Sequence, residues 1–154
     1  GATDLLIEQA STGNAYIHTK NNNREYAIGT ASDYLRFVDL TADVERLRIT
    51  SDGRGLSQFT AKAWVNFNGT GTVAIRDSHN VSSVTDGGVG DYAVNFTNSM
   101  ANASYAAVAG GRWVNGQAGT YFGYNTTAKC QIATSDSAGT YTDQDTVTLI
   151  VFGD

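Results

Sequence analysis

The sequence predicts an all-β protein in two parts. Its polar residues are mostly Thr, Asn, Ser and Gly, which together with Val and Tyr favour strands and turns over helices. Short apolar pieces recur through the first third at intervals of about ten residues, and the later pieces are longer and more regular. We therefore expect a segment of short strands over residues 1–58, followed by an antiparallel, jelly-roll-like β-sandwich over residues 59–154.

Composition narrows the classes of partner. The chain has 154 residues and a formal net charge of −5, with no basic stripe, so we do not expect it to bind nucleic acid. No apolar run approaches the roughly 18 residues of a membrane helix, so we expect no membrane insertion. A single cysteine, Cys130, excludes an intrachain disulfide framework.

Five short apolar pieces are the expected strands of the first part. None is long enough to build a core alone, so this segment is expected to bury its apolar side against other copies of itself. The pieces are residues 5–7, 15–17, 26–28, 35–38 and 47–49.

The second part opens with an expected hairpin over residues 62–75, which alternates on both sides of a turn at 68–71. Trp64 departs from the alternation because it falls on the otherwise polar side. We expect Trp64 to pack at a subunit interface, where an outward tryptophan serves as an anchor. The further expected strands are residues 77–84, 91–96, 104–109, 120–125, 129–134 and 147–152.

The last expected strand is apolar on both sides. The strand alternates Val147, Leu149 and Val151 with Ile150 and Phe152. The two sets point to opposite faces, so only one of them can lie in the sandwich core. A symmetric neighbouring subunit would cover Ile150 and Phe152, and the alternative is cover by loops of the same chain.

Several motifs resemble bacteriophage tail-fibre proteins. Residues 45–53, E-R-L-R-I-T-S-D-G, resemble the E-R-(M/L)-R-I-x-S-x-G segment found near the end of fibre shafts. Within residues 62–96, K-A-W-V-N-F-N-G and N-V-S-S-V-T-D resemble the K-A-W-(V/I)-x-F-x-G and N-V-S-S-(V/I)-x-D motifs of a distal tail module. Residues 147–153 resemble the V-x-V-x-V-F-G-like strand that closes this module, so the resemblance covers most of residues 45–154.

The resemblance implies a homotrimeric fibre tip in the virion, outside the cell, with a shaft-like segment over residues 1–58 and a knob over 59–154. Such a tip would mediate adsorption to a host bacterium by binding a cell-surface polysaccharide or an outer-membrane receptor. The alternative is a structural trimerisation or capping module whose partners are its own copies and the rest of the fibre. The H-x-H iron motif of some needle tips is absent, since only His18 and His79 occur.

Residues 110–124 carry the expected ligand-binding side chains. Aromatic rings stack on the C–H faces of sugars, while amide and guanidinium groups bind hydroxyls. The alternative is that Trp113 and Tyr121 are core or interface aromatics. The expected set is Arg112, Trp113, Asn115, Gln117, Tyr121 and Tyr124.

We do not expect an enzyme, a cofactor or a metal site. Ser78 and His79 are adjacent on a strand and point to opposite faces, so Asp77-Ser78-His79 cannot act as a hydrolytic triad. Glycan hydrolysis requires two facing carboxylates, whereas the aspartates of residues 59–154 fall mainly in turns. Residues 143–145 lack the ligand spacing of an EF-hand and are taken as a strand connection.

Overall fold

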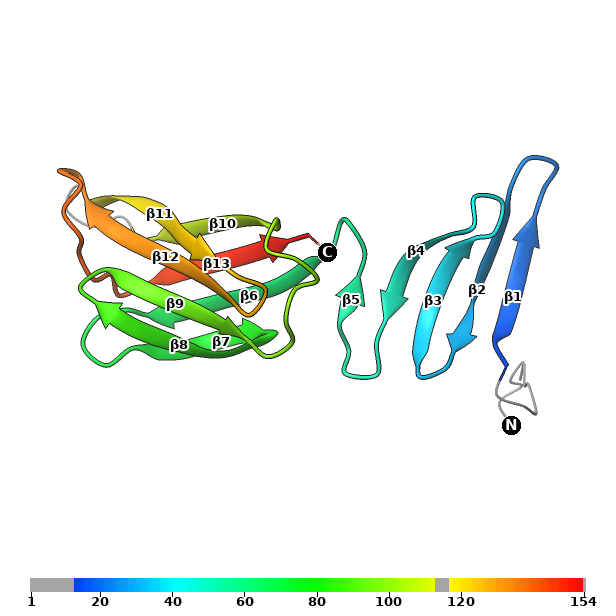
Figure 1. Ribbon diagram of the computed structural model, residues 1–154, viewed down its shortest axis with the longest axis horizontal. Coiled ribbons are helices and arrows are strands. Elements are labelled where there is room, and N and C mark those ends of the chain that lie inside the picture. Colours follow the sequence, from blue (N-terminus) through cyan, green and yellow to red (C-terminus); the bar gives the residue numbers. More distant parts are fainter. Residues whose placement is uncertain (1–12, 113–116, 154) are drawn as a thin grey trace, which may run out of the picture. The chain divides into compact units, whose positions relative to one another are not determined.

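The computed structural model of the protein describes residues 13–112 and 117–153, except for the side chains of residues 117–122. The chain divides into two compact units, Gly1–Ser57 and Gln58–Asp154, where the sequence predicts a boundary between residues 58 and 59. Over the described residues the regular elements are all strands, and their pairings are antiparallel (Figure 1). The predicted all-β, antiparallel fold class is confirmed.

The first unit contains one sheet, which we call sheet 1, with its five strands in sequence order. Left-handed residues, Ser32 and Asp43, form the tight turns after the second and third strands. Of the five apolar pieces, residues 5–7 lie outside the described residues and the other four lie in strands. The strands are β1 (Ala15–Lys20), β2 (Glu25–Ala31), β3 (Tyr34–Asp39), β4 (Val44–Ile49) and β5 (Gly55–Leu56).

The second unit is built from two four-stranded sheets that share one core. Sheet 2 has the order β10-β13-β6-β7, and sheet 3 has the order β11-β12-β9-β8. The strands are β6 (Ala61–Asn68), β7 (Ala74–His79), β8 (Val81–Gly88), β9 (Asp91–Phe96), β10 (Ala106–Gly111), β11 (Gln117–Asn125), β12 (Lys129–Asp136) and β13 (Val147–Phe152).

The strand order differs from the jelly-roll-like connectivity predicted from the sequence. In a jelly roll most consecutive strands alternate between the two sheets. Here β6 and β7, β8 and β9, and β11 and β12 are neighbours within one sheet. Short turns such as residues 89–90 favour hairpins inside a sheet, and alternation of apolar residues does not determine which strands they join.

The core lies between the inner faces of sheets 2 and 3. The Phe67 ring on β6 meets the Tyr92 ring on β9 edge to face, with 5.1 Å between ring centroids. Gly69 lies against the Tyr92 phenol, and a Cβ at this position would be 2.4 Å from the Tyr92 oxygen. The buried residues of this core are Ala63, Val65, Phe67, Tyr92, Val94, Phe96, Met100, Tyr105, Cys130, Ile132, Val147, Leu149 and Val151.

Asn80 divides the single strand predicted over residues 77–84. It adopts a left-handed conformation with φ of 54°, so β7 ends in sheet 2 and β8 begins in sheet 3. Its amide nitrogen donates to the Lys62 carbonyl at 3.0 Å and to the Asn98 carbonyl at 3.1 Å. Its amide oxygen accepts from the Asn98 backbone N–H at 2.8 Å. The prediction was wrong here because alternation continues across a corner that one asparagine makes.

Replacing Asn80 separates the two contributions of this corner. Asn80→Ala removes the side-chain hydrogen bonds and places a Cβ in a left-handed conformation without local compensation. It should lower the free energy of unfolding by about 2–4 kcal/mol. Asn80→Gly removes only the hydrogen bonds, so its free energy of unfolding, measured in urea, should fall by less than that of Asn80→Ala. A glycine variant as unstable as the alanine variant would contradict this account.

Cys130 provides a chemical test of the core. It lies on β12 opposite Val94 and has no exposed surface. Burial raises the pKa of its thiol to about 11, and a hydrogen bond with Tyr105 offsets part of this rise. We expect iodoacetamide at pH 8 to leave Cys130 unmodified in the native protein and to alkylate it fully in urea, as read by mass spectrometry. Rapid alkylation of the native protein would show that the core is open.

Candidate functional site

One face of sheet 1 is a continuous apolar surface without a covering layer among the described residues. One row of apolar residues crosses the sheet, with one member on each strand from β1 to β4 and each directly opposite the next. Its members are Ile17, Ile28, Phe37 and Leu47. Ile17 keeps 51% of its surface exposed and Ile28 keeps 40%. A second row runs parallel to the first, and its members are Ala15, Thr30, Leu35 and Ile49. We call these two rows the apolar face of sheet 1.

The opposite face of sheet 1 is covered by its own long side chains. Arg48 binds Glu45 with 2.8 Å between Nε and Oε1, and its guanidinium lies 4.0 Å from the centre of the Tyr34 ring. The hydrogen bond that Arg48 donates to Glu45 raises the pKa of the Arg48 guanidinium, which stays charged at any ordinary pH. Small apolar residues on this face, Ala27 and Val38, are buried. This face therefore needs no partner.

Asp39 closes one end of sheet 1. Its carboxylate is buried and accepts hydrogen bonds from Arg46 at 2.7 Å, from Arg24 at 2.9 Å and from the Ala42 backbone N–H at 3.1 Å. The Arg46 hydrogen bond is the main cause of a lowered pKa at Asp39, and loss of water contact opposes it. The two arginines come from β4 and from the turn before β2, so Asp39 joins three segments of the sheet.

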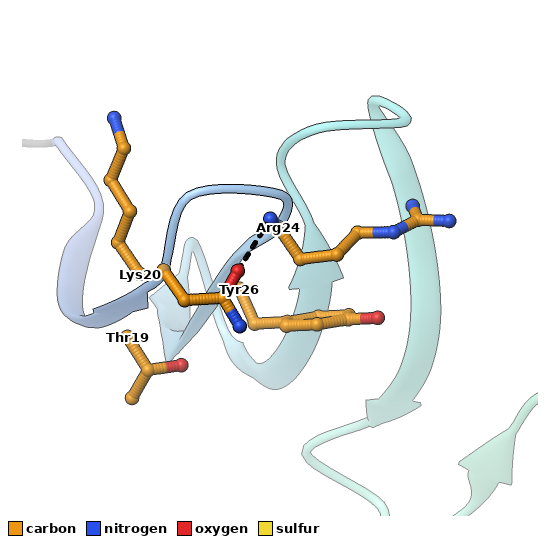
Figure 2. A pocket seen from close by; sticks show the side chains of 5 residues that line it. Thr19, Lys20, Arg24 and Tyr26 are labelled. Carbon is orange, nitrogen blue, oxygen red and sulfur yellow. Dashed lines mark hydrogen bonds between the residues drawn. The ribbon is translucent and has the colours of Figure 1, made fainter.

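A small open hollow of about 180 Å³ lies beside this cluster, at the turn between β1 and β2 (Figure 2). The Tyr26 ring forms its floor, while the Arg24 side chain extends away toward the neighbouring strands. Lys20 pairs with Glu25 at 3.2 Å and Arg24 pairs with Asp39. Since carboxylates of the same sheet already bind both cations, the hollow is not a charged ligand site.

The outer face of sheet 2 brings together the three predicted interface residues. Trp64 on β6 lies directly opposite Ile150 on β13, and Ile150 lies opposite Val108 on β10. Phe152 is on the same face, two residues along β13 from Ile150. Val108 is 65% exposed and Trp64 is half-buried. These four residues form the apolar face of sheet 2.

The predicted ligand-binding residues do not all gather in one place. Arg112 follows β10 at the end of the sandwich that also carries residues 137–146, which we call the far end. Tyr124 lies near the other end of β11, beside the hairpin at residues 126–128. Gln117 and Tyr124 are separated by seven residue steps, which span on the order of 20 Å of strand. Arg112 and Tyr124 therefore cannot contact the same sugar.

The other members of the predicted set are only partly described. Gln117 and Tyr121 belong to β11, and their side chains are outside the described residues, as are Trp113 and Asn115 entirely. Arg112 is exposed and binds Asp145 with 2.7 Å between Nη1 and Oδ2. It is thus part of an exposed ion pair rather than a free guanidinium.

A polar surface covers the outer face of sheet 3, and sequence reasoning identified only Tyr124 within it. Gln131 on β12 donates from Nε2 to Asp91 on β9 at 2.9 Å. Asn95, also on β9, donates from Nδ2 to the hydroxyls of Ser83 at 3.0 Å and Thr85 at 2.9 Å. The alternation of residues 91–96 and 129–134 could have identified these outward polar positions. We call Ser83, Thr85, Asp91, Asn95, Tyr124 and Gln131 the polar face of sheet 3.

The structure bears on the Asp77-Ser78-His79 triplet and on metal-binding groups in the part of the chain that it describes. Ser78 lies opposite the core residue Val65, and His79 lies opposite Trp64, so the two side chains point to opposite faces of sheet 2. Over residues 13–112 and 117–153 there is no group of three His, Cys, Asp or Glu side chains that could hold a metal ion. The same residues include no helix able to cross a membrane.

Comparisons with protein-family models, with curated proteins and with solved structures find no match to this chain.

The lowered pKa of Asp39 predicts that sheet 1 loses stability in acid. Asp39 stabilises the fold above its unfolded pKa of about 4, and this contribution disappears as the pH falls through its lower folded pKa. Asp39→Asn should therefore melt several degrees lower than the parent at pH 7 and lose less stability between pH 5 and pH 2. Thermal unfolding followed by circular dichroism across this range measures both effects.

Asp43→Asn is the matched control, because Asp43 is exposed and its left-handed backbone suits asparagine equally well. It should behave like the parent at every pH. Equal acid sensitivity in the Asp39 variant and the parent would show that the buried carboxylate does not carry this effect.

Proposed function

We propose that this chain is the distal part of a bacteriophage tail fibre, a homotrimer that mediates adsorption to the host bacterial surface by binding a cell-surface glycan. The observation that carries the proposal is the apolar face of sheet 1. A single antiparallel sheet can leave one face in water only if that face is polar. Here the polar face is already covered, and the exposed face is the apolar one.

Other copies of the chain are the simplest cover for this face. Residues of the two rows, such as Ile28 and Phe37, lie directly opposite each other on adjacent strands and form an even surface. Three such surfaces around a common axis would form one shared core. The number three comes from the resemblance of residues 45–53 and 62–96 to tail-fibre motifs. Residues 45–49 of the first motif lie in β4, a strand that contributes Leu47 and Ile49 to the exposed rows.

The apolar face of sheet 2 supports the same assembly. Trp64 and Ile150 lie side by side on the outside of the sandwich, close to Phe152. Aromatic residues with adjoining aliphatic ones are typical of the centre of a protein interface. A neighbouring copy that covers this patch would also account for the two-sided apolar pattern of β13.

A structural capping module is the second candidate, and the far end of the sandwich favours it. The described turns there are rich in small polar residues, as in Gly69-Thr70-Gly71 and Ala138-Gly139-Thr140. This end also carries an exposed aromatic side chain, that of Tyr141, which is 53% exposed. Trp113, an aromatic residue of the expected ligand-binding set, lies outside the described residues. A cap would trimerise without binding any glycan.

Native mass tests the assembly. The purified chain should scatter light as a particle of about three times 16.3 kDa. Ile28→Lys places a charge in the middle of the apolar face of sheet 1, and burying an unpaired charge is costly. This variant should dissociate to a mass near 16.3 kDa or precipitate.

His18→Lys is the control, because His18 is on the opposite face of the same sheet and beside Glu25. It should keep the mass of the parent. A parent mass near 16.3 kDa, with Ile28→Lys equally soluble and equally stable, would overturn the trimer.

A further inference from the structure

We propose that the polar face of sheet 3 is the glycan-binding surface, and that its ligand is a neutral saccharide. This inference rests on the proposed function. It replaces the predicted site over residues 110–124 with one on the side of the sandwich that keeps Tyr124 from the predicted set. Three features of the face support it: an exposed tyrosine on a bulge, two side-chain amides that are already oriented, and a balance of charge that suits an uncharged ligand.

A β-bulge presents Tyr124 to solvent. Phe122 pairs with Ile132 and Asn125 pairs with Cys130, so two residues, Gly123 and Tyr124, face the single Gln131. Tyr124 is 71% exposed. A tyrosine on a strand is held by the hydrogen bonds of the sheet, unlike one on a long loop, and its exposed ring can stack on a sugar.

Gly123 lets Gln131 lie close to the sheet. A Cβ at Gly123 would be 3.1 Å from both Cγ and Cδ of Gln131, which is tighter than an ordinary contact. The Gln131 side chain therefore occupies the space above Gly123, next to Tyr124. Its amide nitrogen binds Asp91, which leaves its amide oxygen oriented for a donor such as a sugar hydroxyl.

Asn95 is oriented in the same way. Its amide nitrogen is bound by two hydroxyls on β8, those of Ser83 and Thr85. Each hydroxyl accepts from Asn95 and keeps its own O–H for a further acceptor. Amides and hydroxyls held in advance lose little conformational entropy on binding, and this is how weak polar contacts become specific.

A small residue lies in the middle of the polar face of sheet 3. Ala93 lies between Gln131 on one side and Thr85 on the other, in the middle of the polar face. Its methyl group is the smallest L side chain, so the neighbouring polar groups stand above it and can reach the edges of a flat ligand. A sugar ring has hydroxyls around its edge and C–H groups on its faces, which matches oriented polar groups beside an aromatic ring.

Charge favours a neutral ligand. Outward positions on β9 and β12 carry one carboxylate, Asp91, and one ammonium, Lys129. An acidic polysaccharide would need several cations in a row, and the chain as a whole carries a net charge of −5. The ammonium of Lys129 and the carboxylate of Asp91 balance each other across this face.

The test uses the full chain on an array of immobilised neutral oligosaccharides built from hexoses, 6-deoxyhexoses and N-acetylhexosamines, with acidic polyuronates on the same slide. The parent should bind at least one neutral glycan. Tyr124→Ala should weaken that binding at least about tenfold, and Gln131→Met, which keeps the shape but removes the amide, should do the same. Repeated weak sites in one assembly make the loss easy to detect.

Tyr141→Ala is the matched control, since Tyr141 is an exposed tyrosine at the far end of the same unit. It should bind like the parent. Unchanged binding by Tyr124→Ala and Gln131→Met, binding only to acidic polyuronates, or no binding to any neutral glycan would overturn the proposal.

Light scattering on the same samples separates this inference from the proposed function. A trimer that binds no neutral glycan would leave the fibre assembly standing and remove the binding face. A monomer that binds a neutral glycan through Tyr124 would keep the face and remove the trimer. Variants that retain the parent's mass and melting temperature exclude loss of binding through misfolding.

Discussion

Every apolar sheet face must be covered, and this requirement organises the molecule. Sheets 2 and 3 satisfy it for each other, because Phe67 and Tyr92 meet between them in a fully buried core. Sheet 1 has no such second layer among the described residues, and its Ile17 and Ile28 remain substantially exposed. Covering this face would stabilise the protein by about 25 cal/mol per Å² of apolar surface removed from water. Only another molecule or another segment can supply that cover.

Most charged side chains on the strands of sheet 1 gather on one of its two faces. The exposed ion pairs on its polar face contribute little stability individually. Ala27 and Val38 on the same face are nevertheless buried, so that face presents polar groups to water. Asp39, in contrast, is buried and bound by Arg24 and Arg46, so it fixes the strand ends rather than the surface. The result is a sheet with one polar face that its own side chains cover, and one apolar face that has no covering layer among the described residues.

Alternation in the sequence was sufficient to predict the strand faces but not their connections. The period of two placed Val147, Leu149 and Val151 in the core and left Ile150 exposed, because side-chain direction on a strand is local. The corner at Asn80 was missed because a left-handed residue depends on hydrogen bonds to Lys62 and Asn98, which are distant in sequence. The expected binding set was split because residues 117–125 form a nine-residue strand, longer than the strand predicted over 120–125, and such a strand holds its two ends far apart. The polar face of sheet 3 combines residues from four strands, and no single segment of the sequence contains it.

The distribution of polarity gives the two outer faces of the sandwich different surface chemistry, which suits the two roles that we propose for them. Sheet 2 presents Val108, Ile150 and Trp64, which lose water readily and bind another protein surface well. Sheet 3 presents amides and hydroxyls that already bind one another, so they are rigid without being buried. If a symmetric copy covers the apolar face of sheet 2, the polar face of sheet 3 is left as the broad side of each sandwich that points to solvent. A fibre that adheres through several weak sites needs such a side on every subunit, because avidity depends on the sites being reachable at the same time.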